Sequence, residues 1–186
     1  MAALAERPLS ELLAEVAAHT PAPGGGCASA WAGALAAALA EMAASFLDDA
    51  PAAGRAAVLR EELLASGERE LHSYEPVLEA YRLPKTDPTR SAHVRAALSE
   101  ASATPLAIAR ACAEVAELAS AAAEKSNPSI RGDAVAGALL AEAASRAAGR
   151  LVEINLAHRR DDTRIEEVSQ LAERAESARE RALGSL

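Results

Sequence analysis

At 186 residues the chain is long enough for one domain with a hydrophobic core but short for two, so we expect a single domain over residues 1–186. Hydrophobic residues make up 51% of the sequence and aromatic residues only 2%, and alanine is abundant, which favours helix over sheet. The net charge of −8 argues against nucleic-acid binding, because that function needs a basic face.

Three further observations restrict the class of protein. The first residues, MAALAERPLSELLAEV, lack the basic segment and apolar core of a secretory signal. The apolar run over residues 27–44 consists mostly of alanine and is a poor membrane span. Cys27 and Cys112 are too few and too far apart for a disulfide framework or a pair of metal ligands. We therefore expect a cytoplasmic protein with no bound metal and no membrane or nucleic-acid partner.

Apolar residues recur at helical spacing through most of the chain. In chain order, the expected helices cover residues 11–18, 27–49, 55–82, 91–125, 134–159 and 164–183. Ser10 is the expected N-cap of the first helix, and Asp133 that of the fifth. Pro76 and Pro105 should bend or interrupt the third and fourth helices. Short loops between long helices predict an all-α, antiparallel bundle of five or six helices.

The second and fifth expected helices, residues 27–49 and 134–159, are apolar on most of their circumference. A helix that is apolar all round must be covered on all sides, and a single bundle of this size has a limited interior. The sequence therefore predicts a homodimer in which a second copy supplies the missing cover.

Glu70 is a charged residue on an apolar helix face. It falls within an arc that includes Leu63, Tyr74 and Val77. An ionised carboxylate at such a position loses hydration, so its pKa should rise unless it finds a cation or hydrogen-bond donors. Two interpretations remain open: a carboxyl group suited to general acid–base chemistry, or a structural ion pair or tyrosine hydrogen bond.

Three basic residues lie on or beside the apolar arc of the fifth helix: Arg146, Arg150 and His158. A buried arginine needs a carboxylate or phosphate partner, which Glu70 or an anionic ligand could supply. The commoner outcome is that such side chains extend to solvent and keep only their stems on the apolar surface.

A run of three glycines, Gly24, Gly25 and Gly26, precedes the second helix in the stretch TPAPGGG. Glycines at a helix start can present backbone N–H groups to an anion. The spacing fits neither the Walker loop nor the dinucleotide-binding fingerprint. Local sequence alone equally allows a tight corner between two packed helices.

Four motifs carry a resemblance to a known family. TPAPGGGCASAWAGALAAALAEM resembles the TPxPGGGSxxAxxGALxxALxxM opening of the cyclodeaminase/cyclohydrolase family. That family comprises the C-terminal domain of formiminotransferase-cyclodeaminase and free-standing methenyltetrahydrofolate cyclohydrolases. YEPVLEAYRLPK, SNPSIRGDAVAGALLAEAA and VEINL are similar to later family segments and occur in the same order.

The resemblance implies an all-helical, dimeric enzyme that acts on one-carbon derivatives of tetrahydrofolate and needs no further cofactor. Hydrolysis of 5,10-methenyltetrahydrofolate to 10-formyltetrahydrofolate is the expected reaction, because the chain has no room for a formiminotransferase domain. Formiminotetrahydrofolate cyclodeamination is one alternative. A non-catalytic helical dimer that binds folate or another anion, or that serves as a scaffold, is the other.

The resemblance also implies roles for individual residues. The family has an acidic residue, usually Asp, four positions before the aromatic residue of the LPK segment, and counting back from Tyr74 reaches Glu70. The implied catalytic residues are Glu70 and Asp133. The implied substrate-binding residues are Gly24, Gly25, Gly26, Lys85, Asn127 and Asn155.

The chain departs from the family pattern at several positions. Besides Glu70 in place of Asp, the departures are Cys27 for Ser, Ser126 for Gly, Gly132 for Ser and Leu151 for Asn. A glutamate carries one methylene more than an aspartate, and small displacements of a catalytic group can cost much of the rate. Of these departures, Gly132 for Ser and Leu151 for Asn favour the non-catalytic alternative.

Overall fold

The computed structural model describes residues 7–20 and 22–185, and within them the chain forms helices and no strand. The helices are α1 (Leu9–Val16), α2 (Gly25–Phe46), α3 (Ala50–Ser73), α4 (Glu75–Arg82), α5 (Arg90–Ala101), α6 (Ala103–Lys125), α7 (Pro128–Asn155) and α8 (Thr163–Gly184). The predicted all-α class is confirmed.

Two of the expected helices are each divided in two. The third becomes α3 and α4, separated by Tyr74, and the fourth becomes α5 and α6, separated by Ser102. Pro76 lies in the first turn of α4, where its missing N–H leaves no helical hydrogen bond unmade. Pro105 similarly lies in the first turn of α6. If each divided pair is counted as one bent helix, the described residues form six helices, as expected.

Both predicted N-caps are wrong. Ser10 lies inside α1 rather than before it. Asp133 lies in the second turn of α7, because that helix begins six residues earlier than expected. Asn127 is the true N-cap: its side chain accepts a hydrogen bond from the backbone N–H of Ser129 at 2.9 Å. Pro128, whose φ is already helical, occupies the first helical position.

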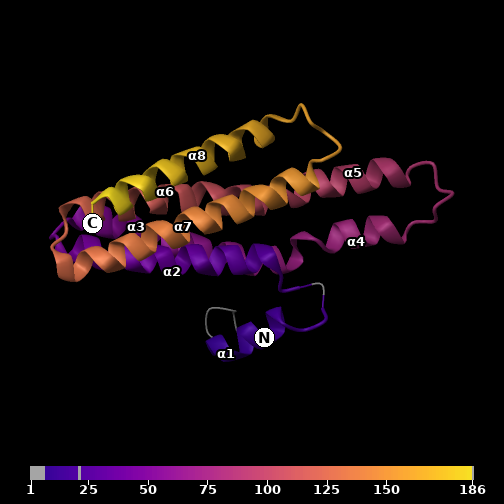
Figure 1. Ribbon diagram of the computed structural model, residues 1–186. Coiled ribbons are helices and arrows are strands. Elements are labelled where there is room, and N and C mark those ends of the chain that lie inside the picture. Colours follow the sequence, from indigo (N-terminus) through magenta and orange to yellow (C-terminus); the bar gives the residue numbers. More distant parts are fainter. Residues whose placement is uncertain (1–6, 21, 186) are drawn as a thin grey trace.

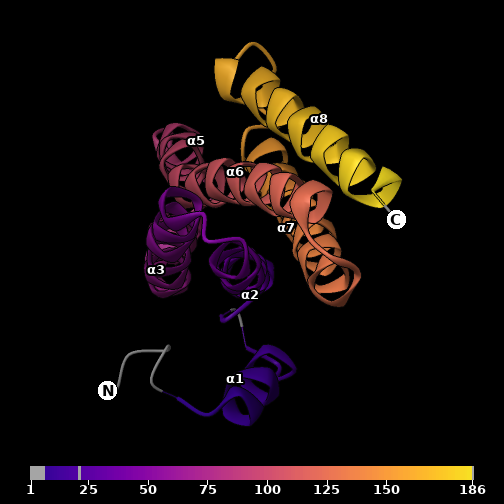
Figure 2. The same cartoon turned by 90° about the vertical axis from the view of Figure 1, so that its left-hand side faces the viewer.

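The helices form a bundle around α2, which packs against α3, α6 and α7, while α8 covers α6 and α7 (Figures 1 and 2). Helices α4 and α5 extend beyond the bundle as an adjacent pair (Figure 1). We call this the α4–α5 end. At the opposite end, α2 turns into α3 and α6 turns into α7. Helix α1 lies to one side of α2 in both views.

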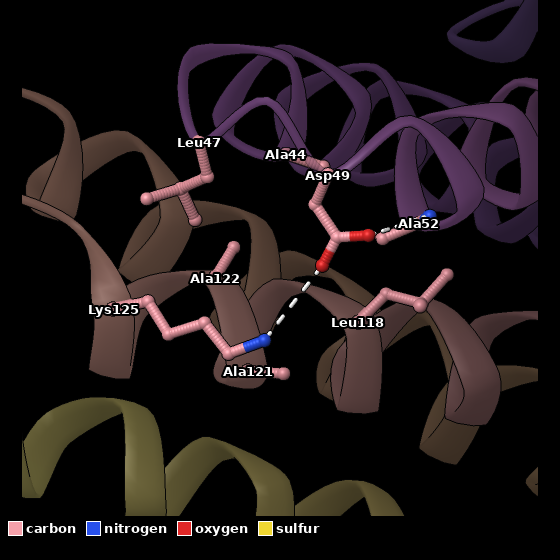
Figure 3. A pocket seen from close by; sticks show the side chains of 8 residues that line it. All are labelled: Ala44, Leu47, Asp49, Ala52, Leu118, Ala121, Ala122 and Lys125. Carbon is pink, nitrogen blue, oxygen red and sulfur yellow. Dashed lines mark hydrogen bonds and ion pairs between the residues drawn. The ribbon is translucent and has the colours of Figure 1, made fainter.

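The turn at the opposite end is held by Asp49 (Figure 3). One carboxylate oxygen accepts from the backbone N–H of Ala52 at 3.2 Å and caps α3, so α2 ends earlier and α3 begins earlier than expected. The other oxygen lies 3.7 Å from Nζ of Lys125, the last residue of α6. Asp49 thereby connects the α2–α3 turn to α6.

Small residues bring α2 very close to its neighbours. A Cβ added at Gly33 would lie 3.2 Å from the methyl groups of Leu63, which is fully buried. A Cβ added at Gly137 of α7 would lie 3.3 Å from the carbonyl oxygen of Ala36. The backbone of α7 at Gly137 therefore lies almost against the backbone of α2, while at Gly33 the Leu63 side chain of α3 fills the space that a side chain of α2 would occupy.

One face of α2 is not covered by the chain itself. Leu35 and Phe46 are 58% and 66% exposed, so a single copy leaves part of this apolar helix uncovered, as the sequence predicts; burial by a second copy stays a prediction. Among the described residues, α2 is the one helix that is long and apolar enough to cross a membrane. Its contacts with three other helices are those of a core helix, which passes the same test.

Candidate active site

The Glu70 side chain, at the last turn of α3, packs directly against the start of α2. A Cβ added at Gly26 would lie 2.5 Å from both Cγ and Cδ of Glu70, so any larger residue at position 26 would displace the carboxylate. None of the described glycines adopts a positive φ. Gly26 is therefore required for space, and the structure brings Glu70 and the glycine run together.

The Glu70 carboxylate is partly buried, and the burial raises its pKa. The Ser73 hydroxyl donates to Oε2 at 3.0 Å, which opposes this effect. Within the part of the chain that the structure describes, no cation pairs with Glu70 and no tyrosine donates to it. The contacts thus favour an acid–base carboxyl group over the structural ion pair or tyrosine hydrogen bond.

The start of α2 has no side-chain cap. Gly24 occupies the N-cap position with an extended φ of −133° and can offer none. The first N–H groups of a helix lack helical acceptors and carry the positive end of its dipole, so Gly25 and Gly26 present donors beside the Glu70 carboxylate. An anionic or carbonyl group of a ligand can bind at this position.

Cys27 is not a nucleophile of this site. Its thiol is 1% exposed and donates to the carbonyl oxygen of Gly67 at 3.4 Å. Burial and then the nearby charge of Glu70 raise its pKa, so the thiol stays protonated at neutral pH. Its role is packing between α2 and α3.

Two of the predicted binding residues lie toward the α4–α5 end. Asn155, the last residue of α7, donates weakly to the carbonyl oxygen of Ala101 at 3.5 Å, next to the break between α5 and α6. Lys85 is exposed in the loop between α4 and α5, at the tip of the projecting pair (Figure 1). Neither side chain forms a hydrogen bond or an ion pair with Glu70.

The remaining two predicted residues, Asp133 and Asn127, lie toward the opposite end. Gly137 of α7 contacts Ala36, which is ten residues along α2 from Gly26, and Asp133 lies about one turn further. At 1.5 Å per residue this places Asp133 roughly 20 Å from Gly26. Asn127 lies further still. Within one chain, these two residues do not join the Glu70 site.

The basic residues expected on the fifth helix do not pair with Glu70, and His158 lies beyond the end of α7 at Asn155. Nη2 of Arg146 lies 2.7 Å from Glu142, and Arg150 pairs with Glu153 on the same helix. His158 is exposed. The commoner outcome, extension to solvent, is the one observed.

Ser73 and the cavity that it lines were not predicted from the sequence. A cavity of about 360 Å³ lies where α3 meets α4 and α5 meets α6. Its polar lining side chains are Arg69, His72, Ser73, Glu100 and Thr104. A serine three residues after Glu70 on a predicted helix was the available signal, because side chains at that spacing share a face.

No group of three or more metal-binding side chains occurs among the residues that the structure describes. The site consists of a partly buried carboxylate, a hydroxyl that donates to it and an uncapped helix start. These groups can stabilise a cationic carbon and exchange a proton with it or with water.

The formiminotransferase-cyclodeaminase family model matches residues 8–174. The chain belongs to this family. A relative in Methylorubrum extorquens, a methenyltetrahydrofolate cyclohydrolase, is 34% identical over 75% of this chain and 74% of its own. The crystal structure of formiminotetrahydrofolate cyclodeaminase from Thermotoga maritima matches with a TM-score of 0.84 and 25% identity. That match covers 98% of this chain and 96% of that one.

The family match includes every residue of the candidate site, from Gly24 to Asn155. The resemblance read from the TPAPGGG and LPK motifs is thus confirmed over most of the chain. The chain is therefore a family member that differs from the family pattern at several positions, among them Glu70 in place of Asp and Cys27 in place of Ser.

Proposed function

We propose that this protein is a one-carbon folate enzyme that hydrolyses 5,10-methenyltetrahydrofolate to 10-formyltetrahydrofolate. The observation that carries the proposal is the Glu70 carboxylate, partly buried and packed against the open start of α2 at Gly26. The family of the chain and the activity named for the Methylorubrum extorquens relative support it.

The chemistry of the substrate suits this arrangement. Its methenyl carbon belongs to an amidinium cation, which a nearby carboxylate stabilises. Water adds to this carbon and Glu70 accepts one of its protons. As the bond from the carbon to N5 breaks, that proton passes to N5, the carbon keeps the oxygen as a formyl group on N10, and the second water proton is released. Burial raises the pKa of Glu70, which brings such proton exchange closer to neutral pH.

The other groups would bind rather than react. In this proposal the N–H groups at Gly24–Gly26 hold an anionic or carbonyl part of the folate. Lys85, exposed at the loop tip, meets the carboxylates of its glutamate tail as a point charge. Asn155 positions the pterin or the water. No cofactor other than the folate itself is required.

Cyclodeamination of formiminotetrahydrofolate is the second candidate, and the match to the Thermotoga maritima cyclodeaminase over nearly the whole of both chains favours it. That reaction forms the same amidinium carbon but expels ammonia instead of adding water. Parallel assays of methenyltetrahydrofolate consumption and of ammonia release from formiminotetrahydrofolate distinguish the two activities.

The test of the active-site assignment is Glu70→Gln, which keeps the size of the side chain and removes the carboxylate. We expect turnover to fall at least about 100-fold while the helical circular dichroism spectrum is unchanged. Glu79→Gln is the matched control, because Glu79 is a glutamate on the adjacent helix α4 and lies outside the candidate site. Full activity of Glu70→Gln would refute the assignment.

Calorimetry with methenyltetrahydrofolate and with 10-formyltetrahydrofolate tests the non-catalytic alternative. Binding by the wild-type protein without turnover of either substrate would favour a folate-binding role. Absence of binding would favour a scaffold. Turnover that depends on Glu70 excludes both.

We also propose that the protein is a homodimer that buries the exposed face of α2. Leu35 and Phe46 lie on one face of α2 and are 58% and 66% exposed, and Leu139 on the neighbouring helix α7 is 39% exposed. Exposed apolar surface of this kind marks an interface. Phe46→Glu should shift the protein to monomers in sedimentation analysis. Val58→Glu, at an exposed position on α3, should not.

A dimer with antiparallel α2 helices would place Asp133 of one copy near the Glu70 site of the other, since the two residues lie toward opposite ends of the chain. Glu70→Gln and Asp133→Asn would then each be inactive alone. Mixing the two variants would restore activity, because one site in each mixed dimer carries neither substitution. Failure to restore it would confine the site to one chain.

A cytoplasmic location is part of the same proposal. Cys27 and Cys112 are free, buried thiols, which is typical of proteins in a reducing compartment. An acidic protein of net charge −8 that acts on a small folate needs no nucleic-acid or membrane partner.

A further inference from the structure

The Ser73 hydroxyl contacts the candidate catalytic carboxylate. Ser73 is the last residue of α3, and its Oγ lies 3.0 Å from Glu70 Oε2 and 3.1 Å from the Glu70 main-chain oxygen. A hydroxyl carries one proton and can donate to only one of these acceptors at a time. On its other side, the Glu70 side chain is confined by Gly26.

We propose that Ser73 is a positioning residue that holds the Glu70 carboxylate against the start of α2 and stabilises its ionised form. This inference rests on the proposed role of Glu70. When Glu70 is ionised, the hydroxyl donates to the carboxylate, and a hydrogen bond to a charged acceptor is stronger than one to a neutral acceptor. When Glu70 is protonated, the hydroxyl can turn to the main-chain oxygen. It therefore has an acceptor in both states.

The contact differs from the ordinary bond of a helical serine to its own helix. Ser29, Ser45 and Ser66, which lie inside α2 and α3, each donate to the carbonyl oxygen four residues earlier and to no side chain. Ser73 reaches only three residues back, and its distance to the carboxylate is the shorter of its two. If Ser73 only stabilised the end of its own helix, the hydrogen bond to the Glu70 main-chain oxygen would be enough, and the contact with the carboxylate would not be needed.

Several other charged or titratable groups lie around the site, but the shift in the Glu70 pKa is caused by burial and by Ser73 rather than by them. They are Cys27 on α2, Glu68, Arg69 and His72 on α3, Glu75 on α4 and Glu100 on α5. Arg69 donates to Ser66 at 2.7 Å, and His72 contacts Glu75 at 2.8 Å. The Cys27 thiol donates to a carbonyl oxygen. Burial raises the pKa of Glu70 and the Ser73 hydrogen bond lowers it, so Ser73 is the group that opposes burial.

The cavity next to Ser73 determines which variants are informative. Because Ser73 lines a cavity of about 360 Å³, a water molecule could replace the hydroxyl in Ser73→Ala. Ser73→Val and Ser73→Thr avoid this ambiguity. Both are β-branched and nearly equal in volume, and they differ only in that threonine keeps the hydroxyl. The difference between them reports the hydrogen bond alone.

The experiment is a carbon-13 NMR titration of protein labelled at the glutamate carboxyl carbon. The Glu70 signal is the one that disappears in Glu70→Gln. Ser73→Thr should titrate like the wild type, and Ser73→Val should titrate at higher pH because the ionised form has lost its donor. On the acid side of the pH profile, kcat/KM of Ser73→Val should be roughly threefold to tenfold lower than that of the wild type. Ser73→Thr should keep the wild-type value.

Equal titration of the Val and Thr variants, both folded, would overturn the inference. The titration needs no turnover, so its result is separate from that of the proposed function. If Glu70→Gln is fully active, the role of Glu70 fails, and with it the role of Ser73 in the reaction. If Glu70→Gln is inactive but Val and Thr titrate alike, only the role of Ser73 fails.

Discussion

Replacing Gly26 by alanine should damage the active site far more than the fold. The new Cβ would lie 2.5 Å from Cγ and Cδ of Glu70, whereas ordinary contacts between such atoms are about 3.5 Å or longer. The glutamate side chain must therefore shift by roughly 1 Å. Because the obstructing atoms belong to a flexible side chain rather than to backbone, rotation about its torsions accommodates the methyl group.

Two magnitudes follow from this geometry. Displacement of a catalytic group by 1 Å costs about 100-fold in rate, so kcat/KM of Gly26→Ala should fall by about that factor. Stability should change little. Alanine gains up to about 1 kcal/mol over glycine in a helix, and loss of the Ser73 hydrogen bond to Glu70 costs a similar amount.

The assay is spectrophotometric consumption of methenyltetrahydrofolate, combined with urea unfolding of the same samples. Gly54→Ala is the matched control, since Gly54 lies within α3 and a Cβ added there would have no neighbouring atom within 4 Å. It should keep full activity and be slightly more stable than the wild type. Wild-type activity of Gly26→Ala would refute the reasoning that its contact with Glu70 sets the position of the carboxylate.

Three further predictions concern stability. Burial raises the folded-state pKa of Glu70, so its contribution is fully present below its unfolded pKa of about 4.3 and is lost as the pH rises through the folded value. The melting temperature of Glu70→Gln relative to wild type should therefore increase from about pH 4 to pH 7, and a constant difference would contradict this. Leu63→Ala should lower the free energy of unfolding by about 2–5 kcal/mol because the side chain is fully buried, whereas Val58→Ala, exposed on the same helix, should cost well under half of that. Asp162 caps α8, and the adjacent Arg164 guanidinium holds its pKa well below the usual range. Asp162→Ala should cost about 1 kcal/mol at neutral pH, and the difference should shrink on acidification as the carboxylate of the wild type is protonated.

The sequence was sufficient for the helices and for Glu70, because both depend on local periodicity. A carboxylate on an apolar arc is partly buried whatever the details of packing, and the structure confirms this. The breaks near Pro76 and Pro105 were predictable for the same reason, since proline acts on its own helix. The exact start of α7 was missed because Asn127–Pro128 can form either a loop or a cap with a first helical turn.

The grouping of the site residues was only partly predictable. The Gly26–Glu70 contact depends on the register between α2 and α3, which periodicity does not determine. The distance of Asp133 from Glu70, by contrast, follows from the antiparallel order of the bundle: the starts of α2 and α7 lie at opposite ends. The family motifs indicate which residues an enzyme of this kind uses, but they do not indicate which of those residues lie close together within one chain.

The close packing of α2 limits how this protein can change during evolution. At Gly33 and Gly137 even one added methyl group would meet a neighbouring helix at 3.3 Å or less. Many of the buried positions on α2 are already alanine or glycine, so truncation removes little volume there. Enlargement is the damaging class of substitution. A library randomised along the buried face of α2 should retain mainly glycine, alanine and serine, while its exposed face tolerates larger residues.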